Sequence, residues 1–405
     1  MLSVEEALEQ VLSHATPKQP TLRQTHAALG LVLAEDVASD VDSPPHDKSV
    51  VDGYAVVSTD LVQRPAELEV LEEITAGAVP KQRVVSGKAT RIMTGASLPE
   101  GADAVVMIEH SQTVPASKNL QRVQISCGTV TPGQNITRRA VCMARGQTIL
   151  RSGAVLRPAE IGLLAEVGRS SVLVIDRPTA AILSTGNELV PASQIPGPGQ
   201  IRNSNGPLLA SAVQAAGATA NELGIARDER EPLRQLVAAG LQSDALVISG
   251  GVSAGVLDLV PSVLEELKVR QIFHKIRLKP GKPLWFGVAE NGCLVFGLPG
   301  NPLSSFVCFE LFVRPALARL AGRAGGGLEE VTAELACEQK HRGDRPTYQP
   351  AYLENVEGGL RVKPLKWQGS GDLRILAEAN ALACLPGGDR EFRAGEVIRV
   401  LRLAP

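Results

Sequence analysis

The segment HKIRLKPGKPLWFGVAENGCLVFGLPGNPLSS, residues His274–Ser305, begins with a dense group of cations. Lys275, Arg277 and Lys279 alternate with apolar residues, and Lys282 follows a Pro-Gly pair. Because side chains repeat every second residue in a strand, this spacing would place the first three cations on one face. The segment therefore predicts a positively charged strand that ends in a turn.

The second half of the same segment predicts a strand, a turn and a helix. The apolar run Cys293–Phe296 leads into Gly297–Pro302, GLPGNP, and then into an apolar stretch with helical spacing. A glycine-rich turn between a strand and a helix offers backbone N–H groups to an oxyanion. Cations on one side and N–H donors on the other predict a pocket for a small, highly charged anion.

Length and composition limit the classes of protein to be considered. The chain has 405 residues, of which 44% are hydrophobic and 21% charged, as in a folded protein of several domains. A net charge of −2 argues against a nucleic-acid partner, and aromatic residues, at 3%, leave little material for stacking on bases. No apolar run reaches transmembrane length, and the acidic N-terminus does not resemble a signal peptide, so we expect no membrane partner.

The six cysteines predict a reducing compartment. None forms a CxxC pair or has a metal-binding spacing, and Cys293 and Cys308 lie in apolar runs where a buried thiol is expected. Unpaired cysteines are typical of the cytoplasm, which is the location we expect. The sequence contains no Walker loop, Rossmann fingerprint or nucleophile elbow.

The pattern of apolar residues changes along the chain and predicts several domains. Ser3 and Glu6 form a capping box before a helix, and residues 156–167 again have helical spacing. From Ser171, strands alternate with helices, which predicts an α/β domain with a parallel sheet. Between the two helical segments, short strand-like runs are separated by Gly and Pro, which predicts an all-β insert. The runs are Tyr54–Ser58, Leu68–Ile74, Lys88–Ile92, Ala104–Ile108 and Arg122–Ser126.

A glycine-rich linker at Gly322–Gly327 precedes a last region of short strands. The predicted fold is therefore a multidomain α/β plus β protein built around a central parallel sheet. Its predicted parts are a discontinuous helical linking domain (1–43 and 142–174), a β-rich insert (44–141), the α/β domain (175–326) and a small C-terminal β domain (327–405).

Three turns follow predicted strands of the α/β domain, at Thr185, Ser249 and Gly297. Any one of them is as well explained as a plain connection between a strand and a helix. In a parallel sheet, however, the carboxyl ends of the strands meet along one edge, where ligands bind. Three such turns in one domain therefore predict a shared site.

Glu188, Asp228 and Asp258 accompany the same turns. A single acid in a loop is most often solvated and without function. Beside an anion pocket, however, a divalent cation can bridge carboxylates to phosphate oxygens, and Mg²⁺ prefers one or two carboxylates with phosphates and water. The three acids predict a metal-assisted phosphate site.

Two Gly-containing turns in the β-rich insert, Asp52-Gly53 and Thr94-Gly95, lie at the ends of predicted strands. Asp-Gly is a strong hairpin signal, so by itself each turn is explained as ordinary hairpin chemistry.

Seven motifs extend over nearly the whole chain. They are SVVDGYAV (Ser49–Val56), IMTGASLPEGADAVVMIE (Ile92–Glu109), STGNEL (Ser184–Leu189), IRNSN (Ile201–Asn205), SGGVSAGVLD (Ser249–Asp258), KPGKP (Lys279–Pro283) and GLPGNPLSS (Gly297–Ser305). By these motifs the chain resembles the molybdopterin molybdenumtransferase family, which includes the MoeA proteins and the E domain of gephyrin. Seven motifs in the family's order are far more specific than any one of them.

The resemblance implies an activity and an assembly. The reaction would insert molybdate into adenylylated molybdopterin with Mg²⁺-dependent release of AMP, the last step of molybdenum cofactor synthesis. The subunits would form an elongated homodimer, with the β-rich insert of one facing the molybdopterin-binding α/β domain of the other. Molybdopterin adenylyltransferase and molybdoenzymes are the protein partners that this activity implies.

The resemblance also implies roles for individual residues. The three acids Glu188, Asp228 and Asp258 would hold the metal. They would also be catalytic, together with Asp52, Thr94, Lys275 and Lys279. The substrate would be bound by Thr185, Gly186, Asn205, Ser249, Gly250, Gly251, Ser253, Lys282, Pro299, Gly300, Asn301 and Ser370.

One segment departs from the family pattern. After Asn135-Ile136 the family usually has an Arg followed by Gly-Glu-Asp, whereas here Arg139 is followed by Ala140, Val141 and Cys142. Two acids are missing, which would make this chain a weaker or specialised enzyme if they order the metal or the dimer.

Three alternatives remain at the level of the sequence. An adenylyltransferase or nucleotide pyrophosphatase would share the α/β domain but lack the insert and the C-terminal domain. A non-catalytic molybdopterin-binding scaffold would keep the fold and bind without turnover, and the change at Ala140–Cys142 is the only support for it. A paralogue specific for tungstate is not separated from one for molybdate, because the two oxyanions have nearly the same size and charge.

Overall fold

The computed structural model describes residues 1–63, 65–115, 120–252 and 259–403. The chain divides into two compact units. The first unit contains residues 1–35, 152–158 and 171–405, and the second contains residues 36–151 and 159–170. None of the described helices is both long and apolar enough to cross a membrane.

A six-stranded sheet forms the centre of the first unit, in the order β17-β14-β18-β21-β20-β19. The first four strands are parallel, and β20 is antiparallel to both of its neighbours, β21 and the edge strand β19, so the predicted parallel sheet is confirmed and extended. The strands are β17 (Thr219–Ala226), β14 (Thr179–Thr185), β18 (Ala245–Ser249), β21 (Leu294–Leu298), β20 (Trp285–Val288) and β19 (Arg270–His274).

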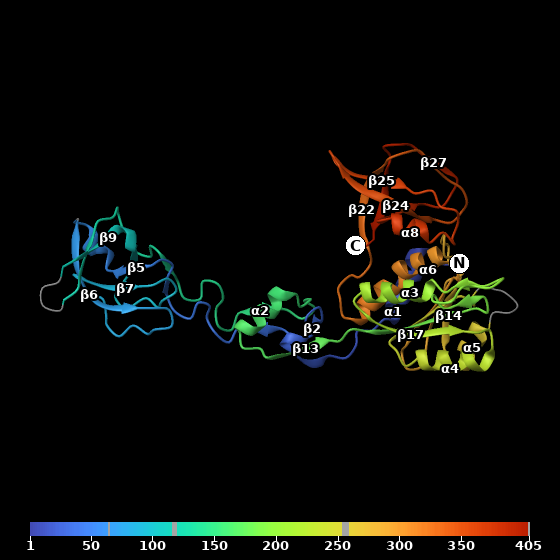
Figure 1. The fold of residues 1–405 in the computed structure, drawn as a ribbon, viewed down its shortest axis with the longest axis horizontal. Coiled ribbons are helices and arrows are strands. Elements are labelled where there is room, and N and C mark those ends of the chain that lie inside the picture. The colour runs from blue at the N-terminus through green and yellow to red at the C-terminus, as the bar shows by residue number, and fades with distance from the viewer. Residues whose placement is uncertain (64, 116–119, 253–258, 404–405) are drawn as a thin grey trace. The chain divides into compact units, whose positions relative to one another are not determined.

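Helices cover both faces of this sheet because its strands are apolar on both sides. Alternate strand residues enter two separate cores: Ala180 and Ile182 of β14 belong to one, and Ala181 and Leu183 to the other. The first core includes α1 (Val4–His14), α3 (Asn205–Ala215), α6 (Pro302–Cys308), the π-helical Phe309–Val313 and α7 (Arg314–Leu320). The second lies under α4 (Arg230–Gly240) and α5 (Val260–Glu266), on the opposite side of the sheet in Figure 1.

The capping box of the first helix is confirmed: Ser3 Oγ accepts from the N–H of Glu6, and Glu6 Oε2 accepts from the N–H of Ser3. This helix, α1, does not belong to a helical linking region, however. Its buried residues Val4, Ala7 and Val11 lie in the core of the α/β domain, because its apolar stripe packs on α7. The linking region instead contains a three-stranded sheet of β1 (Thr21–Gln24), β13 (Ser171–Ile175) and β2 (Val32–Leu33), next to the 3-10 turn Thr25–Ala27.

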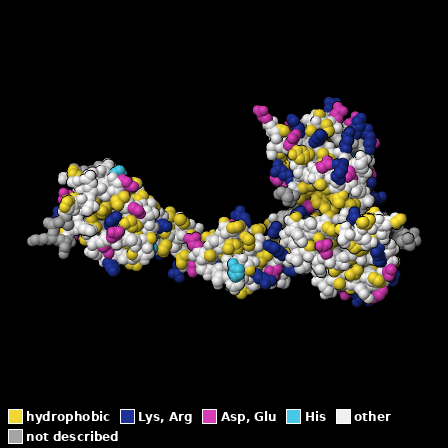
Figure 2. Space-filling model, viewed as in Figure 1, with side chains coloured by type: hydrophobic (Ala, Val, Ile, Leu, Met, Phe, Trp, Pro, Cys, Tyr) yellow, Lys and Arg dark blue, Asp and Glu magenta, His cyan; other side chains and the backbone are white. Residues whose placement is uncertain are grey.

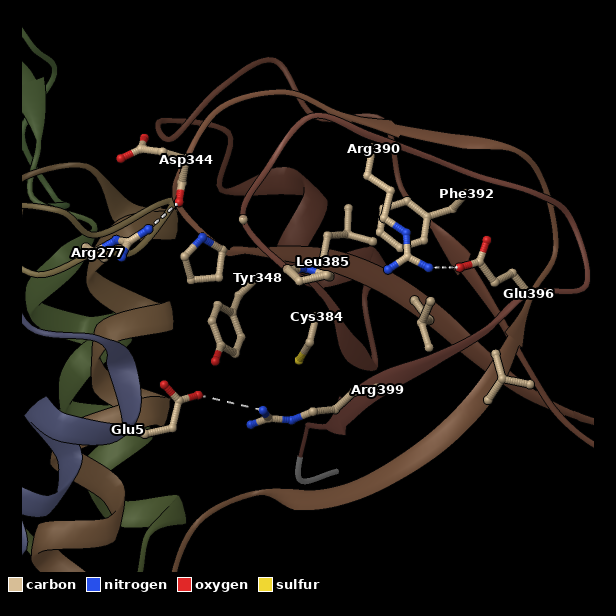
Figure 3. Close-up of a pocket in the computed structure, with 15 residues that line it drawn as sticks. Glu5, Arg277, Asp344, Tyr348, Cys384, Leu385, Arg390, Phe392, Glu396 and Arg399 are labelled. Carbon is tan, nitrogen blue, oxygen red and sulfur yellow. Dashed lines mark hydrogen bonds and ion pairs between the residues drawn. The ribbon is translucent and has the colours of Figure 1, made fainter.

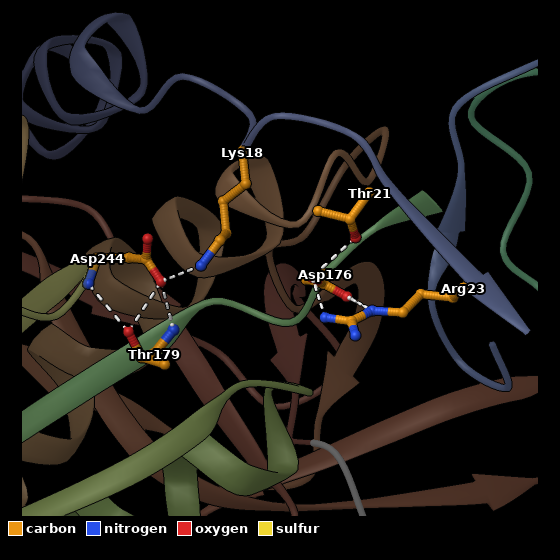
Figure 4. Close-up of polar contacts among 6 residues, drawn as sticks. All are labelled: Lys18, Thr21, Arg23, Asp176, Thr179 and Asp244. Carbon is orange, nitrogen blue, oxygen red and sulfur yellow. Dashed lines mark hydrogen bonds and ion pairs between the residues drawn. The ribbon is translucent and has the colours of Figure 1, made fainter. Parts of the chain in front are cut away.

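Two carboxylates fix the chain just before it enters β14 and β18 of the central sheet (Figure 4). Asp244, just before β18, accepts hydrogen bonds from Lys18 Nζ at 2.6 Å and from the backbone N–H of Thr179 at 2.7 Å. Asp176, after β13, accepts from Thr21 Oγ1 and from the Arg23 guanidinium. We call the contacts of Asp244 with Lys18 and Thr179 the Asp244 clamp.

A closed five-stranded barrel confirms the small C-terminal β domain. Lys and Arg lie among Asp and Glu on the barrel face seen in Figure 2, and pairs such as Arg390–Glu396 and Lys340–Glu391 connect them. The barrel contains β22 (Glu329–Leu335), β25 (Gly359–Pro364), β24 (Thr347–Val356), β26 (Ala381–Leu385) and β28 (Val397–Arg402); β23 (Gln339–His341), β27 (Arg390–Phe392) and α8 (Arg374–Glu378) accompany it.

The second unit contains the predicted all-β insert, and all five predicted runs are strands. Its sheet is β8 (Ala104–Met107), β5 (Gly53–Val56), β7 (Lys88–Ile92), β6 (Ala66–Ile74), β10 (Arg122–Ile125) and β9 (Ser111–Val114), in that order. Short pairs β4–β11 (Lys48–Ser49, Ile136–Thr137) and β3–β12 (Val37–Ala38, Thr148–Leu150), the 3-10 turns Ser58–Leu61 and Ile108–His110, and nearly all of α2 (Pro158–Glu166) complete it.

The predicted cationic strand is wrong. Strand β19 ends at His274, and Lys275 has a φ of 69°, which no strand residue adopts. The backbone folds back on itself: Lys275 N–H donates to Leu284 O, and Ile276 N–H donates to Lys282 O. The alternation in the sequence came from Ile276 and Leu278, which are buried although they are not in a strand.

Candidate functional site

The three predicted turns meet at one cavity of about 640 Å³ in the first unit. They follow β14, β18 and β21, which are parallel neighbours, so their carboxyl ends share one edge of the sheet. Eleven of the residues predicted for the site line this cavity: Thr185, Gly186, Glu188, Asn205, Asp228, Ser249, Gly250, Gly251, Pro299, Gly300 and Asn301.

The turn after β18 depends on glycine. Gly250 and Gly251 have φ values of 91° and 64°, which favour residues without a Cβ. A Cβ on Gly250 would lie 2.7 Å from Thr185 O, and one on Gly251 would lie 2.8 Å from Thr185 Oγ1. The two glycines therefore allow the turn to pass directly beside Thr185.

The side chain of Asn205 connects two of the turns. Its Nδ2 donates to Ser249 Oγ at 2.6 Å and to Gly300 O at 2.7 Å. Asn205 begins α3, and the preceding Asn203 accepts from the Gly206 N–H with its Oδ1, so Asn203 rather than Ser204 caps the helix with its side chain. The start of α3 is thereby fixed against the floor of the cavity.

A loop of the barrel reaches the same cavity. Asn301 Nδ2 donates to Ser370 Oγ at 2.8 Å, and Leu303 N–H donates to Ser370 O at 3.1 Å. Gly371 lines the cavity beside Asn301. The structure therefore places Ser370 next to the site, through Asn301.

Two of the three predicted metal ligands, Glu188 and Asp228, line the cavity, and the third, Asp258, lies outside the described residues, as does Ser253. The carboxylate of Glu188 folds over Gly186, where any side chain would collide with it. Asn187 Oδ1 accepts from the backbone N–H of Asp228 and fixes that loop. Within the described part of the chain, no three His, Cys, Asp or Glu side chains are close enough to hold a metal ion.

The predicted cations do not line this cavity. Lys275, Lys279 and Lys282 are absent from its wall, and Arg277 instead donates to Asp344 O beside a second cavity. Among the described wall residues the only Lys or Arg is Arg202, whose Nε donates to Gln194 O at 3.0 Å. Arg202 lies in the IRNSN motif, which was the signal for it.

Sequence reasoning missed other wall residues as well. Seven of them adjoin a predicted site residue in the chain, and the other two, Ile201 and Asn203, flank Arg202. They are Ser184, Leu189, Ile201, Asn203, Ser204, Val252, Pro283, Pro302 and Gly371.

The second cavity, of about 510 Å³, lies between the barrel and α1 (Figure 3). Tyr348, Cys384 and Arg399 are neighbours across β24, β26 and β28, and Arg399 approaches Glu5 of α1 at 3.9 Å. Burial raises the pKa of the Cys384 thiol to about 12. Apart from Arg277, this cavity contains no residue that the sequence singled out.

Asp52 and Thr94 lie in the second unit and contact one another. Asp52 Oδ1 accepts from both the N–H and the hydroxyl of Thr94, each at 2.7 Å. These two hydrogen bonds lower the pKa of Asp52 below its ordinary value. Asp52-Gly53 is not a hairpin turn, because Gly53 already belongs to β5 and packs against Val106 O so closely that no Cβ fits.

The segment that departs from the family pattern forms a turn in the second unit. Ala140 has a φ of 60°, and its N–H donates to Pro44 O. Arg139 pairs with Asp42, and its N–H donates to Asp47 Oδ1. Val141 is 65% exposed, and Cys142 is also exposed, so the missing acids leave open surface rather than an empty core position.

The thiols behave as predicted. All six cysteines are free, and Cys293 and Cys308 are buried. Burial raises the pKa of Cys293 to about 12 and raises that of Cys308 further, so neither thiol is ionised near neutral pH.

Comparison with known proteins identifies relatives over the full chain. Residues 2–168 match the MoeA N-terminal region (domain I and II), residues 181–319 match a probable molybdopterin binding domain, and residues 332–403 match the MoeA C-terminal region (domain IV).

Individual relatives have the same extent. The molybdopterin molybdenumtransferase of Bacillus subtilis is 34% identical over 99% of this chain and 94% of its own length, and that of Staphylococcus aureus (strain Mu50) is 31% identical over 99% and 95%. The crystal structure of a molybdopterin biosynthesis MoeA protein from Pyrococcus horikoshii matches with a TM-score of 0.86 at 33% identity, over 100% of both chains.

The regions that contain the insert, the parallel sheet and the barrel thus all match proteins of one kind, and the chain belongs to the MoeA family of molybdopterin molybdenumtransferases.

Proposed function

We propose that this protein inserts molybdate into adenylylated molybdopterin and releases AMP, completing the molybdenum cofactor. The observation that carries this proposal is the cavity at the carboxyl ends of β14, β18 and β21, which is built from the family's motifs. The names of its full-length relatives support the same activity. The complete set of domains argues against an adenylyltransferase or a nucleotide pyrophosphatase.

The residues of the cavity can bind and orient anions without a protein nucleophile. Arg202 supplies a positive charge, and Gly300 and Asn301 supply backbone N–H groups in the turn before α6. A water oxygen, or a molybdate oxygen that hydrolysis later releases, forms the new bond to phosphorus, and the phosphoanhydride P–O bond breaks so that AMP leaves. Fixed donors that face the developing negative charge favour this step. The two dithiolene sulfurs form bonds to molybdenum, and one molybdate oxygen leaves as water with the two thiol protons.

The acids of the cavity fit a magnesium ion. Glu188 and Asp228 supply hard carboxylate oxygens from two neighbouring loops, and these are the ligands that Mg²⁺ prefers. We propose that they hold the ion together with Asp258. When bound, the ion would neutralise phosphate charge and polarise the bond to be cleaved.

The proposed assembly is a homodimer with an active site shared between subunits. Asp52 and Thr94 form an exposed, hydrogen-bonded pair in the second unit, which suits a contribution to a partner's site. The proposal keeps Lys275 and Lys279 as catalytic cations, and Lys282, Ser253 and Ser370 as residues that bind the substrate. We also propose the four-domain organisation, with α1 moved from the linking domain to the α/β domain. The proposed location is the cytoplasm, which the free cysteines support. The proposed protein partners are molybdopterin adenylyltransferase and molybdoenzymes.

The test is AMP release from adenylylated molybdopterin by the purified protein, measured with and without molybdate. We expect molybdate to stimulate release, removal of Mg²⁺ by a chelator to abolish it, and re-addition to restore it. Asp228→Asn should lower the rate by about 100-fold if the carboxylate contributes two to three kcal/mol to binding the ion and the transition state. Tight binding without AMP release would instead identify a scaffold, and a larger stimulation by tungstate would identify a tungsten enzyme.

A further inference from the structure

Unpaired polar atoms are concentrated at the floor of the cavity. Within the described residues, four buried side-chain polar atoms lack a hydrogen-bond partner, and two of them are Thr185 Oγ1 and Asn205 Oδ1. Both residues line the cavity, and they are only 4% and 8% exposed. Native proteins pair almost all buried polar atoms, so two unpaired ones at one site indicate a missing partner.

The orientation of the Asn205 amide is fixed. Its Nδ2 donates to Gly300 O and to Ser249 Oγ. A flipped amide would place Oδ1 against the carbonyl oxygen of Gly300, and two acceptors would then face one another. Oδ1 is therefore an acceptor, and its missing partner must be an N–H or O–H donor.

The hydroxyl of Thr185 has the same surroundings. The positive-φ turn of Gly250 and Gly251 passes beside Thr185 Oγ1 and brings no donor or acceptor to it. A hydroxyl can both donate and accept, so it suits a ligand that has both kinds of group side by side.

Phosphate and molybdate do not fit this floor, because their oxygens are acceptors and would be repelled by Asn205 Oδ1. We infer that Asn205 and Thr185 recognise the N–H-bearing edge of a heterocycle in the substrate. The inference rests on the proposed function, under which the substrate carries two such rings, the pterin and the adenine.

The charged groups of the wall then take the other part of the substrate. Arg202, Glu188 and Asp228 lie in β16 (Ile201–Arg202) and in the loops after β14 and β17, whereas Asn205 and Thr185 belong to the uncharged floor at Ser249 and Gly300. The cavity is thereby divided by chemistry: an uncharged floor that selects the ring, and a charged rim that binds the phosphates. Asn205 is a specificity-determining residue in this arrangement.

The experiment measures binding to the full-length protein without molybdate or turnover. The ligands are AMP and N6,N6-dimethyl-AMP, neopterin and its N3-methyl derivative, and inorganic pyrophosphate, which has no ring. The variants are Asn205→Ala, Thr185→Val, which keeps the side-chain shape, and Thr185→Ser, which restores the hydroxyl. Asn380→Ala is the matched control, since Asn380 hydrogen-bonds Leu353 in the barrel, outside the cavity wall.

We expect the wild-type protein to bind one of the two parent rings about tenfold more tightly than its N-methylated derivative. Asn205→Ala should erase that preference and leave pyrophosphate binding within twofold of wild type. Thr185→Val should weaken binding of the same ring severalfold, and Thr185→Ser should restore it. This pair of variants tests the inference even if Asn205→Ala does not fold. The ring that responds identifies whether pterin or adenine occupies the floor.

The inference is overturned if N-methylation does not change the affinity for either ring. It is also overturned if Asn205→Ala weakens the binding of pyrophosphate as much as that of the rings. Those results are expected if Asn205 has only a structural role or hydrogen-bonds only water. In that case Asn205→Ala would show the same relative affinities for the rings and for pyrophosphate as the Asn380→Ala control. Its failure is distinct from failure of the proposed function. Molybdate-stimulated AMP release with binding independent of Asn205 overturns this inference alone, whereas an Asn205-dependent ring preference without AMP release overturns the activity alone.

Discussion

The two edges of the central sheet are built in opposite ways. At the amino ends of β14 and β18, the Asp244 clamp pairs its polar groups: Asp244 Oδ2 accepts from Lys18 Nζ and from both the N–H and the hydroxyl of Thr179. At the carboxyl ends of the same strands, the backbone passes through positive φ at Gly250 and Gly251, and Thr185 Oγ1 and Asn205 Oδ1 are unpaired. One edge is arranged for stability, and the other keeps hydrogen-bonding capacity for a ligand.

The largest effect should come from a substitution at the carboxyl edge. Gly250→Ala places a Cβ at a positive φ and 2.7 Å from Thr185 O, so the turn must move. We expect AMP release to fall by at least about 100-fold and the unfolding free energy by about 2 kcal/mol. Urea unfolding followed by tryptophan fluorescence reports on the first unit, which contains both tryptophans, Trp285 and Trp367.

Gly292→Ala is the control for this substitution, because Gly292 has a φ of 89° but open space around its Cβ position. Gly292→Ala should lower the unfolding free energy by about 1 kcal/mol and leave the rate of AMP release per folded molecule unchanged. Equal losses of rate in the two variants would show that backbone strain alone, and not the approach to Thr185, governs the site.

At the amino edge, Asp244→Asn should reduce stability without reducing activity. Desolvation raises the pKa of Asp244, but its hydrogen bonds with Lys18 and Thr179 outweigh this and hold the pKa below its ordinary value. A lowered pKa stabilises the fold above the unfolded-state value, and this stability is lost as pH falls through the folded-state value. We expect a loss of about 2 kcal/mol at pH 7 and a weaker dependence of stability on pH below about pH 4.

Glu290→Gln is the comparison for this charge, since Glu290 forms an exposed pair with Lys268 at 3.8 Å. Exposed pairs of this kind contribute no more than about 0.5 kcal/mol. If Asp244→Asn lowered the rate per folded molecule, stability and function would not be separated between the two edges.

Cations of the carboxyl edge should differ in effect according to whether they line the cavity. Arg202→Gln should raise the KM for adenylylated molybdopterin about tenfold, and less at high salt because the ions screen its charge. Lys279→Ala should weaken molybdate binding by only about threefold, most at low salt. A loss at Lys279 that equals that at Arg202 and does not depend on salt would indicate a packing role for Lys279.

The smallest effect tests the cost of positive φ outside the sheet. Ala140→Gly should stabilise the second unit by about 1 kcal/mol, because Ala140 has a φ of 60°. Hydrogen exchange of β4 and β11, which flank this segment, is the measurement, since the second unit has no tryptophan. If hydrogen exchange did not change, contacts of the Ala140 side chain would stabilise the folded unit by as much as its positive φ destabilises it.

The two edges also show which features a sequence can predict. The turns at Thr185, Ser249 and Gly297 converge as expected, because the carboxyl ends of parallel strands meet at one edge independently of side-chain conformation. The lysine segment failed, because the direction of each side chain depends on the local backbone, and Lys275 reverses it with a positive φ. The Asp244 clamp could not be predicted, since Lys18 and Asp244 are 226 residues apart and neither belongs to a recognisable motif.

The closure of the barrel has a consequence for the order in which the protein matures during synthesis. Strand β28 pairs with both β22 and β26, so the barrel cannot close before residue 402 has been made. The strands that form the cavity floor are complete by Leu298, but Ser370, which hydrogen-bonds Asn301, belongs to the barrel domain. A nascent chain can therefore form the floor of the cavity before the loop that contains Ser370 has been synthesised. The complete cavity requires that both the α/β domain and the barrel domain have been translated.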